Sequence, residues 1–230
     1  MPSFPGMMDE KNMKSLLISG GSFDYDFVVS HYKKHKDAYD RVIAIDYGER
    51  YAAMAGIPVD LLVGDFDTRG KDGLSEYEKR GIPILQSVPE KDDTDTEMAI
   101  RECLRTGSDF DILCATGGRL DHLLGNLHNL KLGLDAGLRA RLLDPQNTVE
   151  LLRGERRLCR EELPYHYISF LPYAGTAHGV RLVGLKYELS GADLEPGYSL
   201  GVSNEFVPGK DGYVSVEDGI LIMINAKDKG

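Results

Sequence analysis

The chain has 230 residues, of which 42% are hydrophobic and 28% are charged, and its formal net charge is −10 at pH 7. This composition is typical of a globular protein that buries a substantial core in one large domain or two modest ones. The acidic balance argues against nucleic acid and membrane as partners, because a phosphate backbone or an anionic lipid surface requires a basic face. We therefore expect the protein to act on small molecules.

Residues 1–14 lack the hydrophobic core of a signal sequence, and we expect them to form a mobile lead-in. No apolar run approaches the length of a membrane span. The chain has 3 cysteines, Cys103, Cys114 and Cys159, without the spacing of a metal site. An odd number of cysteines in a chain without a signal sequence favours reduced thiols, so a cytoplasmic location is expected.

Short apolar runs alternate with amphipathic stretches from residue 15 to residue 144. The alternation predicts an α/β domain of Rossmann-like, three-layer type, with a mostly parallel sheet covered by helices on both faces. Right-handed crossovers would place the carboxyl ends of the parallel strands at one edge. The expected strands cover residues 15–19, 41–45, 61–63, 82–85, 110–114 and 139–143, and the expected helices cover residues 24–35, 49–55, 74–80, 96–105 and 120–134.

The pattern changes after Pro145 to short alternating segments that are separated by Gly, Pro, Asn or Asp. No helical period remains, which predicts an all-β sandwich or roll over residues 145–230. The expected strands there cover residues 148–152, 156–159, 165–171, 179–183, 198–202, 213–216 and 220–224.

Two aspartates directly follow the third expected strand. Asp65 and Asp67 are two residues apart, so their carboxylates point to the same side if the chain stays extended. Open α/β sheets bind ligands at this edge, and converging carboxylates suit Mg²⁺. The alternative is that both aspartates are ordinary turn residues. Asp46, after the second strand, lies either at the same edge or at the cap of the next helix.

A charged segment precedes the helix expected at residues 96–105. Thr94 begins a capping box there, so part of the segment has a structural role. Asp92 or Asp95 can join a metal site, and Lys91 can neutralise a phosphate. A solvated charged surface is the alternative interpretation of such a run.

Two glycine-rich turns are candidates for binding a nucleotide. Gly20 and Gly21 follow the first strand, where they allow the close approach of a phosphate, although a plain strand-to-helix turn is the alternative. Gly117 and Gly118 lie between the fifth strand and the start of a helix, a position suited to anions. Arg119 follows them, and its planar guanidinium can bind phosphate oxygens in a bidentate fashion.

Polar side chains occupy faces of the helix expected at residues 120–134, beside its leucine stripe. Asp121, His122 and Asn126 are the candidates, with a solvated helix face as the alternative. His122 is more often a hydrogen-bond partner than a base in such a position. In the β domain, Tyr187 offers a flat ring. Ser203 and Asn204 offer polar groups after a strand, although turn chemistry alone also explains them.

Taken together, these segments resemble the thiamine pyrophosphokinase (thiamine diphosphokinase) family. The segments are VGDFDT at 63–68, KDDTD at 91–95, TGGRLDH at 116–122, GLKYEL at 184–189 and SNEF at 203–206. Their order makes the resemblance specific, although no single segment is decisive. Tyr187 stands where many relatives have tryptophan.

The resemblance implies a homodimer whose α/β domain binds ATP and whose β domain binds thiamine at the subunit interface. The implied reaction is the Mg²⁺-dependent transfer of the pyrophosphoryl group of ATP to the hydroxyethyl oxygen of thiamine, giving thiamine diphosphate and AMP. On this hypothesis Asp65, Asp67 and Asp95 hold the metal, Lys91 and Arg119 hold phosphates, and Asp46, Asp92 or Asp121 orients or deprotonates the hydroxyl. The candidates for binding ATP are Gly20, Gly21, Lys91, Gly117, Gly118, Arg119 and His122, and those for binding thiamine are Asn126, Tyr187, Ser203 and Asn204.

Two other functions are compatible with some of these residues. A nucleotide-sugar transferase can also use the Asp65-Phe66-Asp67 motif to bind a metal diphosphate, but the glycine-arginine helix start and the β domain argue against it. A non-catalytic nucleotide or thiamine sensor is the second alternative. The number of carboxylates expected at one edge favours the enzyme, because binding an anion gains nothing from them without a metal.

Overall fold

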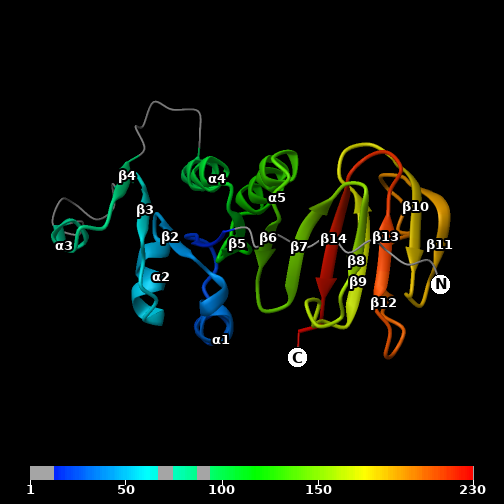
Figure 1. Ribbon diagram of the computed structural model, residues 1–230, viewed down its shortest axis with the longest axis horizontal. Helices are drawn as coiled ribbons and strands as arrows, with labels where there is room; N and C mark the ends of the chain where they lie inside the picture. The colour runs from blue at the N-terminus through cyan, green and yellow to red at the C-terminus, as the bar shows by residue number, and fades with distance from the viewer. Residues whose placement is uncertain (1–12, 67–74, 87–93, 230) are drawn as a thin grey trace.

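The computed structural model describes residues 13–66, 75–86 and 94–229. Most of the expected lead-in, together with Asp67, Lys91 and Asp92, lies outside these residues. Within these described ranges the chain forms one sheet of ten strands and a second sheet of four strands. Figure 1 shows the long sheet extending through the molecule from β4 at one end to the antiparallel strands at the other.

Every strand and helix expected before residue 144 is present, with boundaries within two residues of those expected. The elements are β1 (Lys14–Ile18), α1 (Tyr25–His35), η1 (Lys36–Ala38), β2 (Arg41–Ile45), α2 (Gly48–Ala55), β3 (Leu61–Gly64), α3 (Ser75–Lys79), β4 (Ile84–Gln86), α4 (Asp95–Thr106), β5 (Asp109–Leu113), α5 (Leu120–Asp135) and β6 (Ala140–Leu143).

The strands of this half are parallel, as expected, in the order β4-β3-β2-β1-β5-β6. From β1 to β4 the chain adds each new strand on one side. It then returns to place β5 on the other side of β1. The loops after β1 and β5 therefore leave neighbouring strands in opposite directions, which opens a crevice at the carboxyl edge of the sheet.

The second half continues the same sheet, because β7 pairs antiparallel with β6 across the turn at residues 144–147. The order there is β6-β7-β14-β9-β12, and the four-stranded sheet has the order β11-β10-β13-β8. The elements are β7 (Asn147–Leu152), β8 (Glu155–Leu158), β9 (Tyr167–Pro172), β10 (Ala177–Val183), β11 (Leu189–Leu194), β12 (Asn204–Glu205), β13 (Gly212–Ser215) and β14 (Leu221–Ala226).

One expected strand is wrong, and two observed strands were not expected: β11 and the two-residue β12. Residues 198–202 form turns and bends rather than a strand. The longer of the two, β11 (Leu189–Leu194), lies at the edge of the smaller sheet, and only Leu194 of its 6 residues is buried. An edge strand of this kind buries few side chains, so its sequence lacks the apolar alternation by which strands are recognised.

In the described part of the chain the core has three parts, set by the alternation of side chains along the strands. On β1, Leu17 packs with residues of α4 and α5 on one face of the sheet, and Leu16 packs with residues of α1 and α2 on the other. Residues of the two sheets, including Phe170 and Val214, form the third part between them. The second half of the chain is therefore a sandwich, one of the two expected architectures.

A buried ionic network lies in the parallel part of the sheet. Asp111 is 1% exposed and accepts hydrogen bonds from Arg141 at 2.6 and 2.7 Å and from the Tyr39 hydroxyl at 2.6 Å. Lys14 lies 2.9 Å from the same carboxylate. Burial alone would raise the pKa of Asp111, but Arg141 and Lys14 hold it well below its usual range. The network therefore contains an ionised, fully paired carboxylate.

His31 contacts Tyr39 in this network and is expected to make the stability of the fold depend on pH. Its Nε2 atom lies 2.7 Å from the Tyr39 hydroxyl, and it must donate there because that hydroxyl already donates to Asp111. Burial lowers the pKa of His31 to about 4. In the unfolded chain the imidazole of His31 binds a proton below about pH 6.5. In the folded chain it stays neutral until the pH falls to about 4. Stability is therefore expected to fall as pH decreases from about 6.5 to about 4.

Urea unfolding at a series of pH values tests this expectation. His31→Gln keeps a donor for Tyr39 but cannot titrate, so its stability should change less steeply over that pH interval than that of the unsubstituted protein. Other titrating groups are common to both proteins and cancel in the difference. Parallel curves for the two proteins would contradict the assignment.

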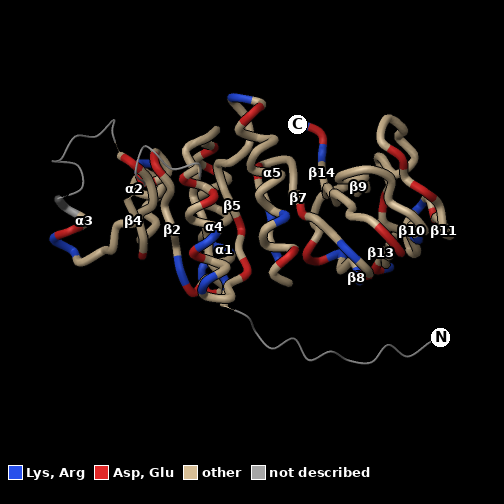
Figure 2. Tube along the Cα trace, turned by 90° about the horizontal axis from the view of Figure 1, so that it is seen from above, with Lys and Arg blue, Asp and Glu red and all other residues tan. Residues whose placement is uncertain are grey.

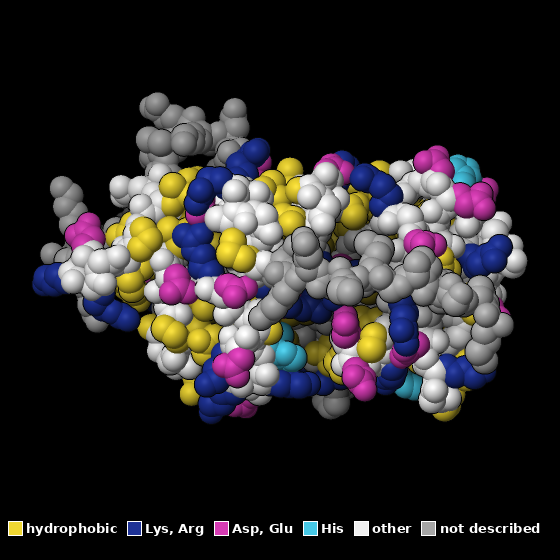
Figure 3. Space-filling model, in the orientation of Figure 1, with side chains coloured by type: hydrophobic (Ala, Val, Ile, Leu, Met, Phe, Trp, Pro, Cys, Tyr) yellow, Lys and Arg dark blue, Asp and Glu magenta, His cyan; other side chains and the backbone are white. Residues whose placement is uncertain are grey.

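Charges of both signs are interspersed along the chain (Figure 2). On the face seen in Figure 3, the described residues show basic and acidic side chains mixed, without a broad basic patch. Within the part of the chain that the structure describes, no helix is long and apolar enough to cross a membrane.

Candidate functional site

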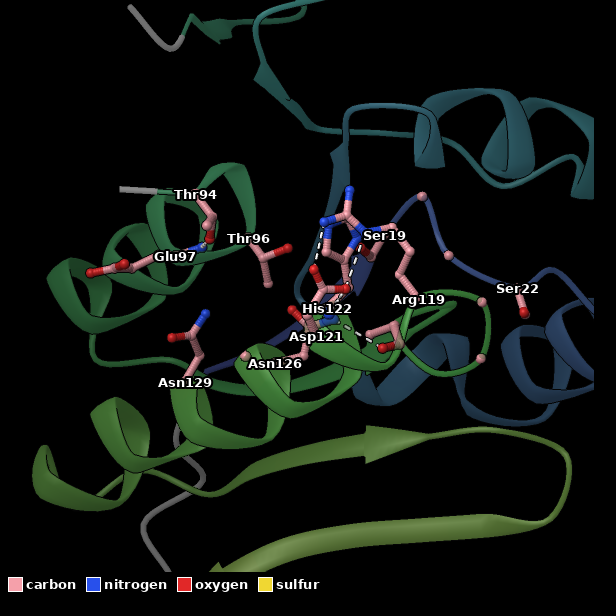
Figure 4. A pocket seen from close by; sticks show the side chains of 16 residues that line it. Ser19, Ser22, Thr94, Thr96, Glu97, Arg119, Asp121, His122, Asn126 and Asn129 are labelled. Atoms are coloured by element: carbon pink, nitrogen blue, oxygen red, sulfur yellow. Dashed lines mark hydrogen bonds and ion pairs between the residues drawn. The ribbon is translucent and has the colours of Figure 1, made fainter. Parts of the chain in front are cut away.

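A pocket of about 610 Å³ opens at the carboxyl ends of β1 and β5. Figure 4 shows side chains converging on it from the start of α4, from α5 and from the loop after β1. Its position is the crevice where the strand order reverses, the usual ligand site of an open parallel sheet. The lining residues are Ser19, Gly20, Gly21, Ser22, Thr94, Thr96, Glu97, Ala115, Gly117, Gly118, Arg119, Asp121, His122, Gly125, Asn126 and Asn129.

The two predicted glycine turns lie together in this pocket. The Gly21 amide donates to the Cys114 carbonyl at 2.7 Å, and the Ser22 amide donates to the Thr116 carbonyl at 3.1 Å. A Cβ atom on Gly21 would lie only 2.5 Å from that Cys114 oxygen. Gly117 has a φ of 75°, and a Cβ atom there would overlap the Ser22 side chain. At Gly21 and Gly117 the two turns approach each other too closely for a side chain, so together they form one backbone cradle, and glycine turns of this kind suit a phosphate.

Arg119 and Asp121 form an exposed ion pair at the rim of the pocket. The Arg119 guanidinium donates to the two Asp121 oxygens at 3.0 and 2.5 Å. The His122 amide also donates to Asp121, at 3.0 Å. These bonds, those from Arg119 first, lower the pKa of Asp121 to about 2, which makes it a weak proton acceptor. Because the pair is solvated, a phosphate can replace the carboxylate on the guanidinium at little cost.

Helix α5 contributes Asn126, whose Nδ2 atom donates to the Ala115 carbonyl at 2.9 Å. This bond ties the helix to the loop after β5. Opposite it, the start of α4 provides Thr96 and Glu97, which the sequence analysis did not assign to the site (Figure 4). The helical spacing from Asn126 to Asn129 is the signal that could have identified Asn129 as a further lining residue.

The predicted acidic residues after β2 and β3 lie at neighbouring strand ends. The Asp46 amide donates to the Val63 carbonyl at 2.9 Å. The Oδ1 atom of Asp46 lies 2.8 Å from the position that a Cβ on Gly64 would occupy. Gly64 directly precedes Asp65, so the sheet brings the Asp46 side chain to the backbone next to Asp65, as expected from the parallel topology.

Several of the predicted segments also contain a non-glycine residue with an uncommon backbone conformation. Four non-glycine residues of the described chain have positive φ: Asp46 at 53°, Phe66 at 53°, Cys114 at 57° and Ser203 at 56°. Asp46, Phe66 and Ser203 belong to the predicted segments, and Cys114 lies two residues before the segment at 116–122. Non-glycine residues rarely adopt this conformation, and such residues cluster at ligand sites.

The predicted metal ligands are only partly described. Asp65 follows β3 and Asp95 begins α4, whereas Asp67 lies outside the described residues, as do Lys91 and Asp92. Among residues 13–66, 75–86 and 94–229, no group of three or more His, Cys, Asp and Glu side chains is placed to hold a metal ion. The donor chemistry fits Mg²⁺, since carboxylate oxygens are its usual protein ligands.

The residues predicted for thiamine in the β domain form a separate group, which is not part of the pocket lining. Tyr187 is 57% exposed on the sandwich. The Ser203 amide donates to the Ser169 hydroxyl at 2.9 Å, which holds Ser203 in its strained conformation. Asn204 is buried, and its side chain bonds the backbone of Tyr187. The exposed side chains of Tyr187 and Ser203 are therefore available for a ligand, whereas the side chain of Asn204 is not.

The fold and pocket are typical of an enzyme that binds a phosphorylated nucleotide at the carboxyl edge of a parallel sheet. Comparison with known proteins identifies the family within this class of enzymes. Residues 32–140 match the family "Thiamin pyrophosphokinase, catalytic domain", and residues 156–221 match "Thiamin pyrophosphokinase, vitamin B1 binding domain".

Individual relatives agree with the family matches. The chain is 34% identical to thiamine pyrophosphokinase of Bacillus subtilis over 197 residues, which are 84% of this chain and 91% of the relative. The crystal structure of the Bacillus subtilis enzyme aligns with a TM-score of 0.82 at 30% identity, over 94% of this chain and all (100%) of that one. Thiamin pyrophosphokinase of Geobacillus thermodenitrificans aligns with a TM-score of 0.80 at 27% identity, over 95% and 99% of the two chains. This protein therefore belongs to the thiamine pyrophosphokinase family and is an enzyme of that class.

Proposed function

We propose that the protein transfers the pyrophosphoryl group of ATP to the hydroxyethyl oxygen of thiamine, with Mg²⁺ as cofactor, and releases AMP. The observation that carries this proposal is the backbone cradle of the two glycine turns, with Arg119 at its rim. Both features suit a chain of phosphates. Gly20, Gly21, Gly117, Gly118, Arg119 and His122 would bind ATP from the same pocket.

Pyrophosphoryl transfer depends mainly on placing the reactants and neutralising the phosphates. Arg119 would exchange Asp121 for phosphate oxygens, and Lys91 would add a second positive charge. Asp65, Asp67 and Asp95 would hold Mg²⁺, which supplies charge neutralisation at the phosphates when bound. Asp46, beside Asp65, would support this group electrostatically.

The hydroxyl of thiamine must lose a proton as it attacks phosphorus. In the free protein the hydrogen bonds from Arg119 lower the pKa of Asp121 to about 2, so Asp121 can accept this proton only after phosphate oxygens have replaced it on Arg119. We assign the role of orienting or deprotonating the hydroxyl to Asp46, Asp92 or Asp121.

Thiamine would be bound by Asn126 in the pocket and by Tyr187 and Ser203 on the sandwich. Because the last two do not line the pocket of their own chain, we propose a homodimer in which both domains contribute to each thiamine site. In this proposal, residues 15–144 form the Rossmann-like ATP-binding catalytic domain, and residues 145–230 form the thiamine-binding and dimerisation domain. The expected location is the cytoplasm.

A direct assay tests the reaction. Purified protein is incubated with thiamine, ATP and Mg²⁺, and the products are separated by chromatography. Thiamine diphosphate and AMP should appear in equal amounts, and chelation of the metal should abolish both. ADP with thiamine monophosphate would contradict transfer of the pyrophosphoryl group. Binding of ATP by calorimetry without release of AMP would instead support the sensor.

A further inference from the structure

We propose that Asn204 is a positioning residue for thiamine, which acts through Tyr187 and does not contact the substrate. Its buried side chain would hold the backbone of Tyr187 so that the exposed ring of Tyr187 stays in place as a flat wall for a ring of thiamine. The inference rests on the proposed function, and it replaces direct binding by Asn204 as the role of that residue.

The hydrogen bonds of Asn204 support this role. The side chain is on a residue only 3% exposed. Its Oδ1 atom accepts from the Tyr187 amide at 2.9 Å and from the Glu205 amide at 2.9 Å, and its Nδ2 atom donates to the Tyr187 carbonyl at 2.7 Å. Both polar atoms of the amide are thus bonded to backbone, and burial keeps them away from a ligand.

Tyr187 lies outside the strands, and its backbone amide and carbonyl both bond the Asn204 side chain. It occupies a bend between β10 and β11, so the sheet does not fix its backbone. The residue is 57% exposed, and the Lys186 ammonium group lies 5.4 Å from its ring centroid. Lys186 is in turn tied to Glu205 by an ion pair of 2.7 Å and by a backbone hydrogen bond of 2.8 Å. The two segments GLKYEL and SNEF therefore form a single unit, with Asn204 at its centre.

The chain contains a matched control for this arrangement. Asn225 is 0% exposed, and its side chain also bonds the backbone of a tyrosine that lies outside the strands. It accepts from the Tyr165 amide at 2.9 Å and donates to the Tyr165 and Tyr167 carbonyls at 3.1 and 2.7 Å. Neither Asn225 nor these tyrosines belong to a proposed substrate site. Asn204→Ala and Asn225→Ala should therefore destabilise the sandwich similarly, but only the first should affect thiamine.

The test is steady-state kinetics of the full-length enzyme. Asn204→Ala should raise the KM for thiamine about tenfold, the order expected when one aromatic stacking contact is lost, and leave the KM for ATP and kcat nearly unchanged. Asn225→Ala should leave all three unchanged. If Asn204→Ala changes only the melting temperature, as Asn225→Ala does, Asn204 is merely structural and the proposal is overturned. If the unsubstituted enzyme forms no thiamine diphosphate, the proposed function itself fails.

A double-mutant cycle separates action through Tyr187 from direct contact. Tyr187→Ala combined with Asn204→Ala should be no worse for the thiamine KM than Tyr187→Ala alone, because the second change acts only through the ring. Additive effects would show direct contact by Asn204 and overturn the proposal. So would an unchanged thiamine KM in Tyr187→Ala.

A fluorescence measurement keeps the proposal testable if Asn204→Ala folds poorly. The chain has 0 tryptophans, so Tyr187→Trp places a single reporter at the proposed wall. Thiamine should quench this fluorescence. In the same background, Asn204→Ser, which retains a short polar side chain, should lower the fluorescence anisotropy and weaken the quenching. Unchanged anisotropy and quenching would overturn the proposal.

Discussion

Replacing Arg119 with alanine is expected to reduce kcat/KM for ATP by about 10³-fold, the order of effect found when a single phosphate-binding arginine is removed from a phosphoryl-transfer site. Arg119 stands at the rim of the glycine cradle, where its guanidinium already holds the Asp121 carboxylate in bidentate geometry. When the Arg119 guanidinium binds phosphate oxygens in this geometry, the interaction strengthens in the transition state, because negative charge moves toward the departing AMP. Most of the loss should therefore appear in kcat.

Two further variants make this expectation specific. Arg119→Lys keeps the charge but not the planar pair of donors, so it should recover only part of the activity. Arg157 is also exposed and also paired with an aspartate, Asp211, at 2.8 Å. Because that pair lies on the sandwich away from the pocket lining, Arg157→Ala should be fully active. An active Arg119→Ala enzyme would remove Arg119 from the phosphate site.

Asp65→Asn is expected to lower kcat by about 10²-fold to 10³-fold, as loss of one electrostatic partner of a transition state does. It should also shift the Mg²⁺ concentration that gives half-maximal activity to higher values. The substitution preserves the size of the side chain and removes its negative charge, so the metal loses a charged ligand while the strand end is kept.

Titration of activity with Mg²⁺ at saturating ATP and thiamine is the measurement. Asp193→Asn is a suitable control, because Asp193 is an exposed carboxylate on the sandwich that pairs with His178 at 3.0 Å. It should leave the Mg²⁺ titration unchanged. If Asp65→Asn has the same kcat and the same metal dependence as the unsubstituted enzyme, the assignment of Asp65 to the metal is refuted.

The elements of the α/β half were predictable from the sequence because each has a local signal. The parallel strands are buried on both faces, so they appear as short apolar runs such as residues 61–63. The helices between them carry caps and apolar stripes: the Thr94 hydroxyl accepts from the Glu97 amide at 3.2 Å, as the capping box indicates. The edge strand β11 lacks such a signal and was missed.

The candidate site was predictable where topology alone places residues together. Both glycine turns follow parallel strands, and the parallel order brings them to one edge of the sheet. Thr96 and Glu97 were not assigned to the pocket, because their part in it depends on how α4 packs beside α5. Packing between two helices depends on contacts across the whole domain and leaves no local pattern in either helix.

The sequence by itself determined the succession of elements, the segments that carry polar groups and the family that they resemble. The tertiary structure alone decided that β6 and β7 join the two halves in one sheet, and that Arg119 pairs with Asp121. It also decided that the side chain of Asn204 faces the backbone of Tyr187, 17 residues earlier in the chain. Apolar periodicity and turn chemistry act between near neighbours and are visible in the sequence. The hydrogen-bond partner of a buried amide is set by the distant segment that folding brings beside it.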